Sequence, residues 1–116
     1  MDHNIDSADS MAMLMATCGY DVRTAYDSAT AIHEAASFVP HVALLDLSEP
    51  EPDGLELASR FQRMEETKKT VLIAISGYGQ PDDLERTRQA GFAHHLVKPT
   101  DLEVIHKLIK SMRLVD

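Results

Sequence analysis

The sequence lacks features that several classes of protein require. It has 116 residues and a single cysteine, Cys18, so a disulfide within the chain is excluded. No apolar run approaches the ~20 residues of a membrane-spanning helix. No Lys or Arg precedes Arg23, so the basic flank of a secretory signal is missing. We therefore expect a cytoplasmic protein with no membrane association.

Basic residues are also scarce relative to acidic ones. Lys and Arg number 11 against 19 Asp and Glu, which gives a formal net charge of −8 with the histidines neutral. Binding to nucleic acid through bulk charge requires clustered Lys and Arg, so we expect no nucleic-acid partner for this chain. Hydrophobic residues make up 44% and charged residues 26%, which is typical of one soluble globular domain.

Amphipathic segments alternate with short apolar segments along the whole chain. Apolar residues recur at the spacing of one helical face over 6–18, which predicts a helix there. Segments 41–47 and 70–76 are almost wholly apolar, as is typical of strands covered on both faces. Ser28 and Thr100 are expected to cap the helices that follow them. The remaining expected elements are helices at 28–39, 53–64, 81–91 and 100–112 and strands at 20–26 and 93–97.

This alternation predicts an α/β fold, a doubly wound parallel sheet with helices on both faces. In such sheets the functional groups lie beyond the carboxyl ends of the strands. Asp46, Ser76 and Lys98 each end one of the predicted apolar strands. The stretch from Asp2 to Asn4, which contains a carboxylate and an imidazole, precedes the first helix. We therefore expect these groups to share one edge of the sheet.

Such a set of groups suits phosphoryl chemistry. A carboxylate can attack a phosphoryl group as a nucleophile, and further carboxylates can hold Mg²⁺. A lysine and a hydroxyl can bind the phosphoryl oxygens. Asp46 alone is as typical of a polar strand end as of a reactive group. The combination with Ser76 and Lys98 is what favours a phosphoacceptor.

The same residues lie within four motifs, which are, in chain order, DHNIDSADS, DLSEPEPDG, ISGYG and HHLVKPTD. On these elements and in this order they resemble the receiver domain of bacterial two-component response regulators. HHLVKP together with ISGYGQ is similar to receivers attached to hybrid histidine kinases. The resemblance covers nearly the whole chain and implies one flavodoxin-like receiver domain over 1–116. It also implies a phosphorylatable signalling domain rather than an enzyme.

The resemblance assigns roles to individual residues. Asp46 would accept a phosphoryl group from a histidine kinase or phosphotransfer protein, Ser76 would sense that group, and Lys98 would contact it. His95 stands where the family usually has an aromatic residue that turns inward when the hydroxyl engages, and it adds a pH-sensitive hydrogen bond to this switch. The bond between Lys98 and Pro99 would be cis.

The resemblance also implies a Mg²⁺ site made of Asp2, His3, Asp46 and the backbone carbonyl of Ser48. His3 departs from the family, which has a metal-binding carboxylate at this position. Mg²⁺ prefers oxygen ligands, so imidazole is a poor substitute and we expect weak binding. Asp2 is the residue that can compensate, directly or through water.

A larger departure concerns the family's first strand, which is central in its sheet of order 2-1-3-4-5. That strand should precede Asp2, where only Met1 is present. We interpret the chain as an N-terminally truncated receiver, produced either by a gene start assigned inside that strand or as a true remnant. In a remnant, strands 20–26 and 42–47 would pair directly, leave a gap, or borrow a strand from another molecule. We favour a homo-oligomer formed through the unpaired edge.

Two other functions remain open at this stage. One is a degenerate receiver that acts as a protein-interaction module without phosphorylation. The other is a flavodoxin-like cofactor binder, which the lack of a Gly/Ser/Thr-rich phosphate loop disfavours. A shared metal site at His94 and His95 is also disfavoured, because adjacent strand residues point to opposite faces.

Overall fold

The computed structural model describes residues 1–2, 4–47, 53–77, 81–98 and 100–112. Within them, three parallel strands form one sheet in the order β1-β2-β3. The strands are β1 (Val42–Asp46), β2 (Val71–Ser76) and β3 (His94–Val97). The register places Asp46 opposite Ile75, and Ser76 opposite Val97. The carboxyl ends of all three strands therefore meet at the same edge.

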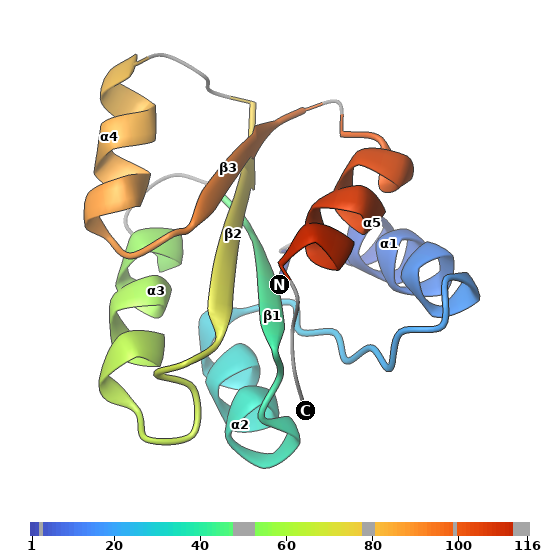
Figure 1. Ribbon diagram of the computed structural model, residues 1–116. Helices are drawn as coiled ribbons and strands as arrows, with labels where there is room; N and C mark the ends of the chain where they lie inside the picture. The colour runs from blue at the N-terminus through green and yellow to red at the C-terminus, as the bar shows by residue number, and fades with distance from the viewer. Residues whose placement is uncertain (3, 48–52, 78–80, 99, 113–116) are drawn as a thin grey trace.

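Five helices in the described part of the chain cover both faces of this sheet. Figure 1 shows α3 (Asp53–Arg63) and α4 (Pro81–Gln89) on one side and α1 (Ile5–Thr17) and α5 (Leu102–Ser111) on the other. Alternate strand residues supply the two core layers, with Leu72 and Ala74 on the side of α2 (Ser28–Phe38) and α3, and Ile75 on the α1–α5 side. The α/β class and the parallel, doubly covered sheet are thus confirmed.

The two predicted helix caps are each wrong by one residue. The Asp27 carboxylate caps α2 by accepting from the Thr30 N–H at 2.7 Å, and the Asp101 carboxylate caps α5 by accepting from the Glu103 N–H at 2.9 Å. Asp and Ser are comparable as N-cap residues, but a carboxylate also interacts favourably with the helix dipole. No helix in the described residues is both long and apolar enough to cross a bilayer.

The predicted strand at 20–26 is wrong. The segment 20–25 belongs to no element, and the sheet of the described residues contains β1, β2 and β3 only. A strand is defined by its ladder of backbone hydrogen bonds, and this segment has almost no neighbour to bond with. The Asp2 N–H donates one bond to it, at 3.1 Å, to the carbonyl of Ala25.

Met1 lies between this segment and β1. Its ammonium donates to the Leu44 carbonyl at 2.6 Å, and its own carbonyl accepts from the Asp46 N–H at 2.9 Å. That pair of bonds is the pattern of a parallel ladder and places Met1 opposite Leu45.

An open cavity of about 1030 Å³ continues from Met1 along β1, and we call it the slot. Its lining includes the apolar side chains of Met11, Met15, Val22, Ala35, Val42 and Leu44. Three arrangements are expected for a remnant: direct pairing of 20–26 with 42–47, a gap between them, or a strand borrowed from another molecule. The single chain has the gap, which is the slot. Direct pairing of 20–26 with β1 does not occur within the described residues.

Candidate functional site

The three expected strand-end residues occupy one edge of the sheet. Asp46 is the last residue of β1 and Ser76 the last of β2, and their residue exposures are only 8% and 1%. Lys98 follows β3, and its backbone N–H donates to the Ser76 carbonyl at 2.7 Å. Parallel pairing therefore extends beyond the strands and fixes where the Lys98 side chain begins.

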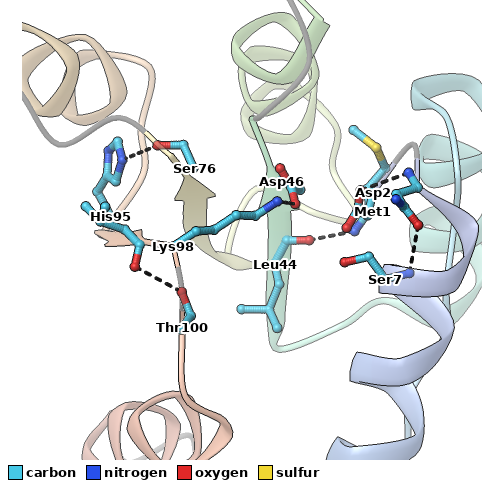
Figure 2. Close-up of polar contacts among 11 residues, drawn as sticks. Met1, Asp2, Ser7, Leu44, Asp46, Ser76, His95, Lys98 and Thr100 are labelled. Atoms are coloured by element: carbon cyan, nitrogen blue, oxygen red, sulfur yellow. Dashed lines mark hydrogen bonds and ion pairs between the residues drawn. The ribbon is translucent and has the colours of Figure 1, made fainter.

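Asp46 and Lys98 form an ion pair. The Lys98 Nζ lies 2.5 Å from Asp46 Oδ2, and the two side chains are 39% and 8% exposed. Figure 2 shows the Lys98 side chain extending from the end of β3 across the sheet edge to Asp46 on β1. A buried carboxylate is costly unless it is paired and hydrogen-bonded, so Lys98 stabilises the ionised form of Asp46.

The Met1 ammonium lies close to the carboxylates of Asp2 and Asp46. Burial lowers the pKa of the Met1 ammonium from its ordinary value of 8.0, and the charges of Asp2 and Asp46 oppose that shift. The Asp2 carboxylate also accepts a hydrogen bond from the Asn4 N–H at 2.9 Å. The N-terminal stretch thus brings a second carboxylate to the edge that carries Asp46.

The expected Mg²⁺ ligands are described only in part. His3, Ser48 and Pro99 lie outside the described residues, so the predictions made for them stay predictions. Among the residues that are described, no three His, Cys, Asp or Glu side chains cluster as a metal site. Mg²⁺ is commonly held by one or two carboxylates, with water and phosphate completing its octahedron. Asp2 and Asp46 fit that requirement.

Ser76 makes its described side-chain contact on the other side, toward α4. Its hydroxyl lies 2.7 Å from His95 Nε2, and the opposite ring nitrogen of His95, Nδ1, lies 3.1 Å from the Thr87 hydroxyl. The Thr87 hydroxyl donates to the Leu84 carbonyl at 2.9 Å. Figure 2 shows the Ser76 hydroxyl facing the His95 ring while Asp46 faces Lys98.

Thr87 is a site-adjacent residue that sequence reasoning missed. It is 5% exposed in a helix whose neighbouring residues Arg86 and Arg88 are exposed. The available signal was an uncharged residue inside the strongly polar run DDLERTRQ. His94, by contrast, is exposed and stands apart from this network.

Comparison with known proteins places this geometry in a family. The chain is 26% identical over 110 residues to the regulatory protein AtoC of Escherichia coli, covering 91% of this chain but only 23% of AtoC. It is 26% identical over 93 residues to the sporulation initiation phosphotransferase F of Bacillus subtilis, covering 80% and 73% of the two chains. The chain thus spans less than a quarter of AtoC, one of its curated relatives.

Solved structures support the same fold. The chemotaxis protein CheY4 of Vibrio cholerae superposes with a TM-score of 0.87 at 23% identity, covering 95% of this chain and 92% of that one. The model of the response regulator receiver domain matches residues 1–110. The chain therefore belongs to the response regulator receiver domain family of two-component systems.

Proposed function

We propose that this receiver domain accepts a phosphoryl group on the carboxylate of Asp46. The observation that carries the proposal is the buried Asp46 at the end of β1, ion-paired with Lys98 at 2.5 Å. A carboxylate held ionised beside a cation at a shared strand edge has the two things that phosphoryl acceptance requires. These are a nucleophile and a positive charge for the incoming oxygens.

The donor in this proposal is a phosphohistidine of a histidine kinase or a phosphotransfer protein. A carboxylate oxygen of Asp46 attacks phosphorus, the P–N bond breaks, and the imidazole nitrogen leaves with the electron pair and takes up a proton. The product is an acyl phosphate on Asp46. Receiver domains interact with such partners, and the relative named a phosphotransferase supports this choice of donor.

Lys98 and Ser76 have separate roles in this mechanism. Lys98 contacts the phosphoryl oxygens with its ammonium and offsets their negative charge. Ser76 donates its hydroxyl hydrogen bond to one of these oxygens, which requires the hydroxyl to leave its present contact with His95. Phosphorylation thereby changes the hydrogen bonds at the ends of β2 and β3. Because His95 also contacts Thr87, the change extends to α4.

Receiver domains bind Mg²⁺ at an acidic pocket, and Asp2 and Asp46 are the described residues that would hold it here. The ion supplies positive charge that neutralises the phosphoryl oxygens. The Ser48 carbonyl would be a further protein ligand, and His3 would contribute little because imidazole suits Mg²⁺ poorly.

Phosphorylation by a small donor tests the proposal directly. The chain is incubated with acetyl phosphate and Mg²⁺, and the added phosphoryl group is detected by intact-mass spectrometry and mapped after reduction of the acyl phosphate. We expect labelling at Asp46 that Asp46→Asn abolishes. Asp21→Asn, a matched change at an exposed carboxylate paired with Arg23, should label normally. Labelling that persists in Asp46→Asn would refute the assignment.

A phosphorylation-independent interaction module is the second candidate. The observation in its favour is that the Ser76 hydroxyl faces His95 rather than Asp46, together with the imidazole at position 3. This candidate predicts no labelling by acetyl phosphate with saturating Mg²⁺, and partner binding that Asp46→Asn leaves unchanged. The labelling experiment therefore separates the two functions.

A further inference from the structure

We infer that His95 controls the direction of the Ser76 hydroxyl, so that protonation of this imidazole favours the contact between Ser76 and a phosphoryl group on Asp46. The inference rests on the proposed function and adds to it a positioning residue and a dependence on pH. It follows from counting the protons in the chain of hydrogen bonds that joins Ser76, His95 and Thr87.

Thr87 lies at the end of this chain of hydrogen bonds. A hydroxyl has one proton to donate, and Thr87 donates it to the Leu84 carbonyl at 2.9 Å. Toward His95 Nδ1, 3.1 Å away, Thr87 is therefore an acceptor, and Nδ1 must carry a proton. In a neutral imidazole only one nitrogen is protonated, so Nε2 is left as an acceptor. The Ser76 hydroxyl, 2.7 Å from Nε2, is consequently the donor in that bond.

This arrangement creates a competition for one proton. Phosphoryl oxygens are acceptors only, so Ser76 can engage them only by donating its hydroxyl proton. With His95 neutral, that proton already points to Nε2, on the side of the sheet edge away from Asp46 (Figure 2). Engagement of the phosphoryl group then breaks the bond and leaves a half-buried imidazole nitrogen without its donor.

A protonated His95 removes this competition. Both ring nitrogens are then donors, and Nε2–H donates to a lone pair of the Ser76 oxygen. The bond to Thr87 is unchanged, because Thr87 already accepts. Only the Ser76–His95 bond reverses, and the Ser76 proton becomes available to a phosphoryl oxygen.

A phosphoryl group on Asp46 also favours the protonated ring. The hydroxyls of Ser76 and Thr87 that contact the ring do not titrate in the range in which imidazole does. The Asp46–Lys98 pair carries no net charge until phosphorylation adds negative charge to it, which attracts a cationic His95. The other charged or titratable groups on the adjoining elements are His94 on β3 and Asp82, Asp83, Glu85, Arg86 and Arg88 on α4.

The tautomer is the first test, and it requires neither metal nor phosphoryl group. Nitrogen-15 NMR of the imidazoles, assigned by comparison with His95→Phe, reports which nitrogen is protonated. At about pH 8, where ordinary imidazoles are neutral, we expect His95 to carry its proton on Nδ1. Protonation on Nε2 instead would overturn the inference and leave the proposed function untouched.

The second test measures the affinity for beryllofluoride, a phosphoryl analogue, in the presence of Mg²⁺. It compares about pH 5.5 with about pH 7.5, on either side of the range in which imidazole titrates. Binding of the analogue and of the metal depends on pH for reasons unrelated to His95. For each protein we therefore take the ratio of the affinity at the lower pH to the affinity at the higher pH. The ratio for the native chain is then compared with the ratio for His95→Phe. We expect the low-pH preference to be at least about fivefold larger in the native chain.

Two further variants make the outcome decisive. His94→Phe, at the exposed neighbouring position, should keep the native pH ratio. Thr87→Val removes the acceptor that fixes the Nδ1 proton and should lose the tautomer preference, which keeps the inference testable if His95→Phe does not fold. Equal pH ratios in the native chain and His95→Phe would overturn the inference alone. No binding of beryllofluoride by the native chain at either pH would overturn the proposed function and the inference together.

Discussion

Met1 is in parallel ladder register with Leu45 of β1, through one bond donated to the Leu44 carbonyl and one accepted from the Asp46 N–H. Within the described part of the chain, strand β1 is therefore paired on both sides only at its carboxyl end. Leu47 donates to Ile75 of β2, and ladder alternation turns the Leu44 N–H toward the slot. The slot follows the rest of this edge, with about 1030 Å³ of space beside it.

The first prediction is that an apolar segment of about six residues, fused before Met1, will stabilise the fold by occupying the slot. Each backbone group that gains a partner recovers on the order of 1–3 kcal/mol where it was buried and unpaired. The melting temperature should rise by about 4 °C for each kcal/mol gained. Calorimetry of the native and extended chains measures this. A Gly/Ser extension of the same length is the control and should leave the melting temperature unchanged.

The same extension should favour the monomer. We predict that the native chain self-associates through the open edge of β1, because exposed edges template strand pairing. Sedimentation velocity over a range of concentrations should show association for the native chain and none for the apolar extension. A native chain that stays monomeric at high concentration would refute the association while leaving the prediction on melting temperature intact.

The second prediction concerns the Met1 ammonium, whose pKa is lowered chiefly by burial, with Asp2 and Asp46 opposing the shift. Between this lowered value and the ordinary 8.0, the unfolded chain binds more protons than the folded one. The free energy of unfolding should therefore rise with pH across that window and level off above it. Urea denaturation at several pH values measures the effect. N-terminal acetylation keeps an N–H donor but removes the titration, and it should abolish this rise.

Local patterns were sufficient to predict β1, β2, β3 and the helices, because apolar runs and helical periodicity are properties of short segments. They were not sufficient for 20–26. Its β-branched and aromatic residues are typical of a strand, but strand formation also needs a ladder with a neighbouring backbone. Among the described residues, the N-terminal stretch offers it one backbone bond, from the Asp2 N–H to the Ala25 carbonyl. The failure is therefore one of tertiary context rather than of propensity.

The candidate site was likewise predictable from the sequence only in part. Asp46 and Lys98 could be brought together from sequence, because the carboxyl ends of parallel strands share an edge. Thr87 could not, since its contact with His95 depends on how α4 packs beside β3. The side to which the Ser76 hydroxyl turns also depends on that packing and is visible only in the structure.

The third prediction is that removing the Lys98 charge destabilises the chain through Asp46. Lys98→Met removes the ammonium that is ion-paired with the buried Asp46 carboxylate, and breaking such a pair costs several kcal/mol at a fully buried site. Because Lys98 is 39% exposed, water offsets part of this, and we expect a loss of about 1–2 kcal/mol at neutral pH. Chemical denaturation measures it. The double variant Asp46→Asn with Lys98→Met should recover most of the loss, since both charges of the pair are then absent.

A matched control for this prediction is Lys107→Met. Lys107 pairs with Glu103 at 3.5 Å, and both side chains are largely exposed, so its loss should change stability by no more than about 0.5 kcal/mol. Equal destabilisation by Lys98→Met and Lys107→Met would mean that the buried pair contributes no more than a surface one.

The fourth prediction concerns the metal affinity of the proposed site. His3→Asp replaces an imidazole by the hard oxygen ligand that Mg²⁺ prefers, next to Asp2 in the short stretch that precedes α1. We expect Mg²⁺ binding to tighten by about tenfold, which corresponds to about 1.4 kcal/mol of binding free energy. Isothermal titration calorimetry of both forms measures the change, and the rate of labelling by acetyl phosphate at limiting Mg²⁺ should rise with it.

Two comparisons make the Mg²⁺ result interpretable. His94→Asp adds the same carboxylate at an exposed position on β3 and should leave the affinity unchanged. Asp2→Asn should weaken binding in the native chain, because Asp2 and Asp46 are the described carboxylates of the site. Equal affinities of the native chain and His3→Asp, with a loss in Asp2→Asn, would show that Asp2 already supplies the missing oxygen. Equal affinities of all three would remove position 3 and Asp2 from the metal site altogether.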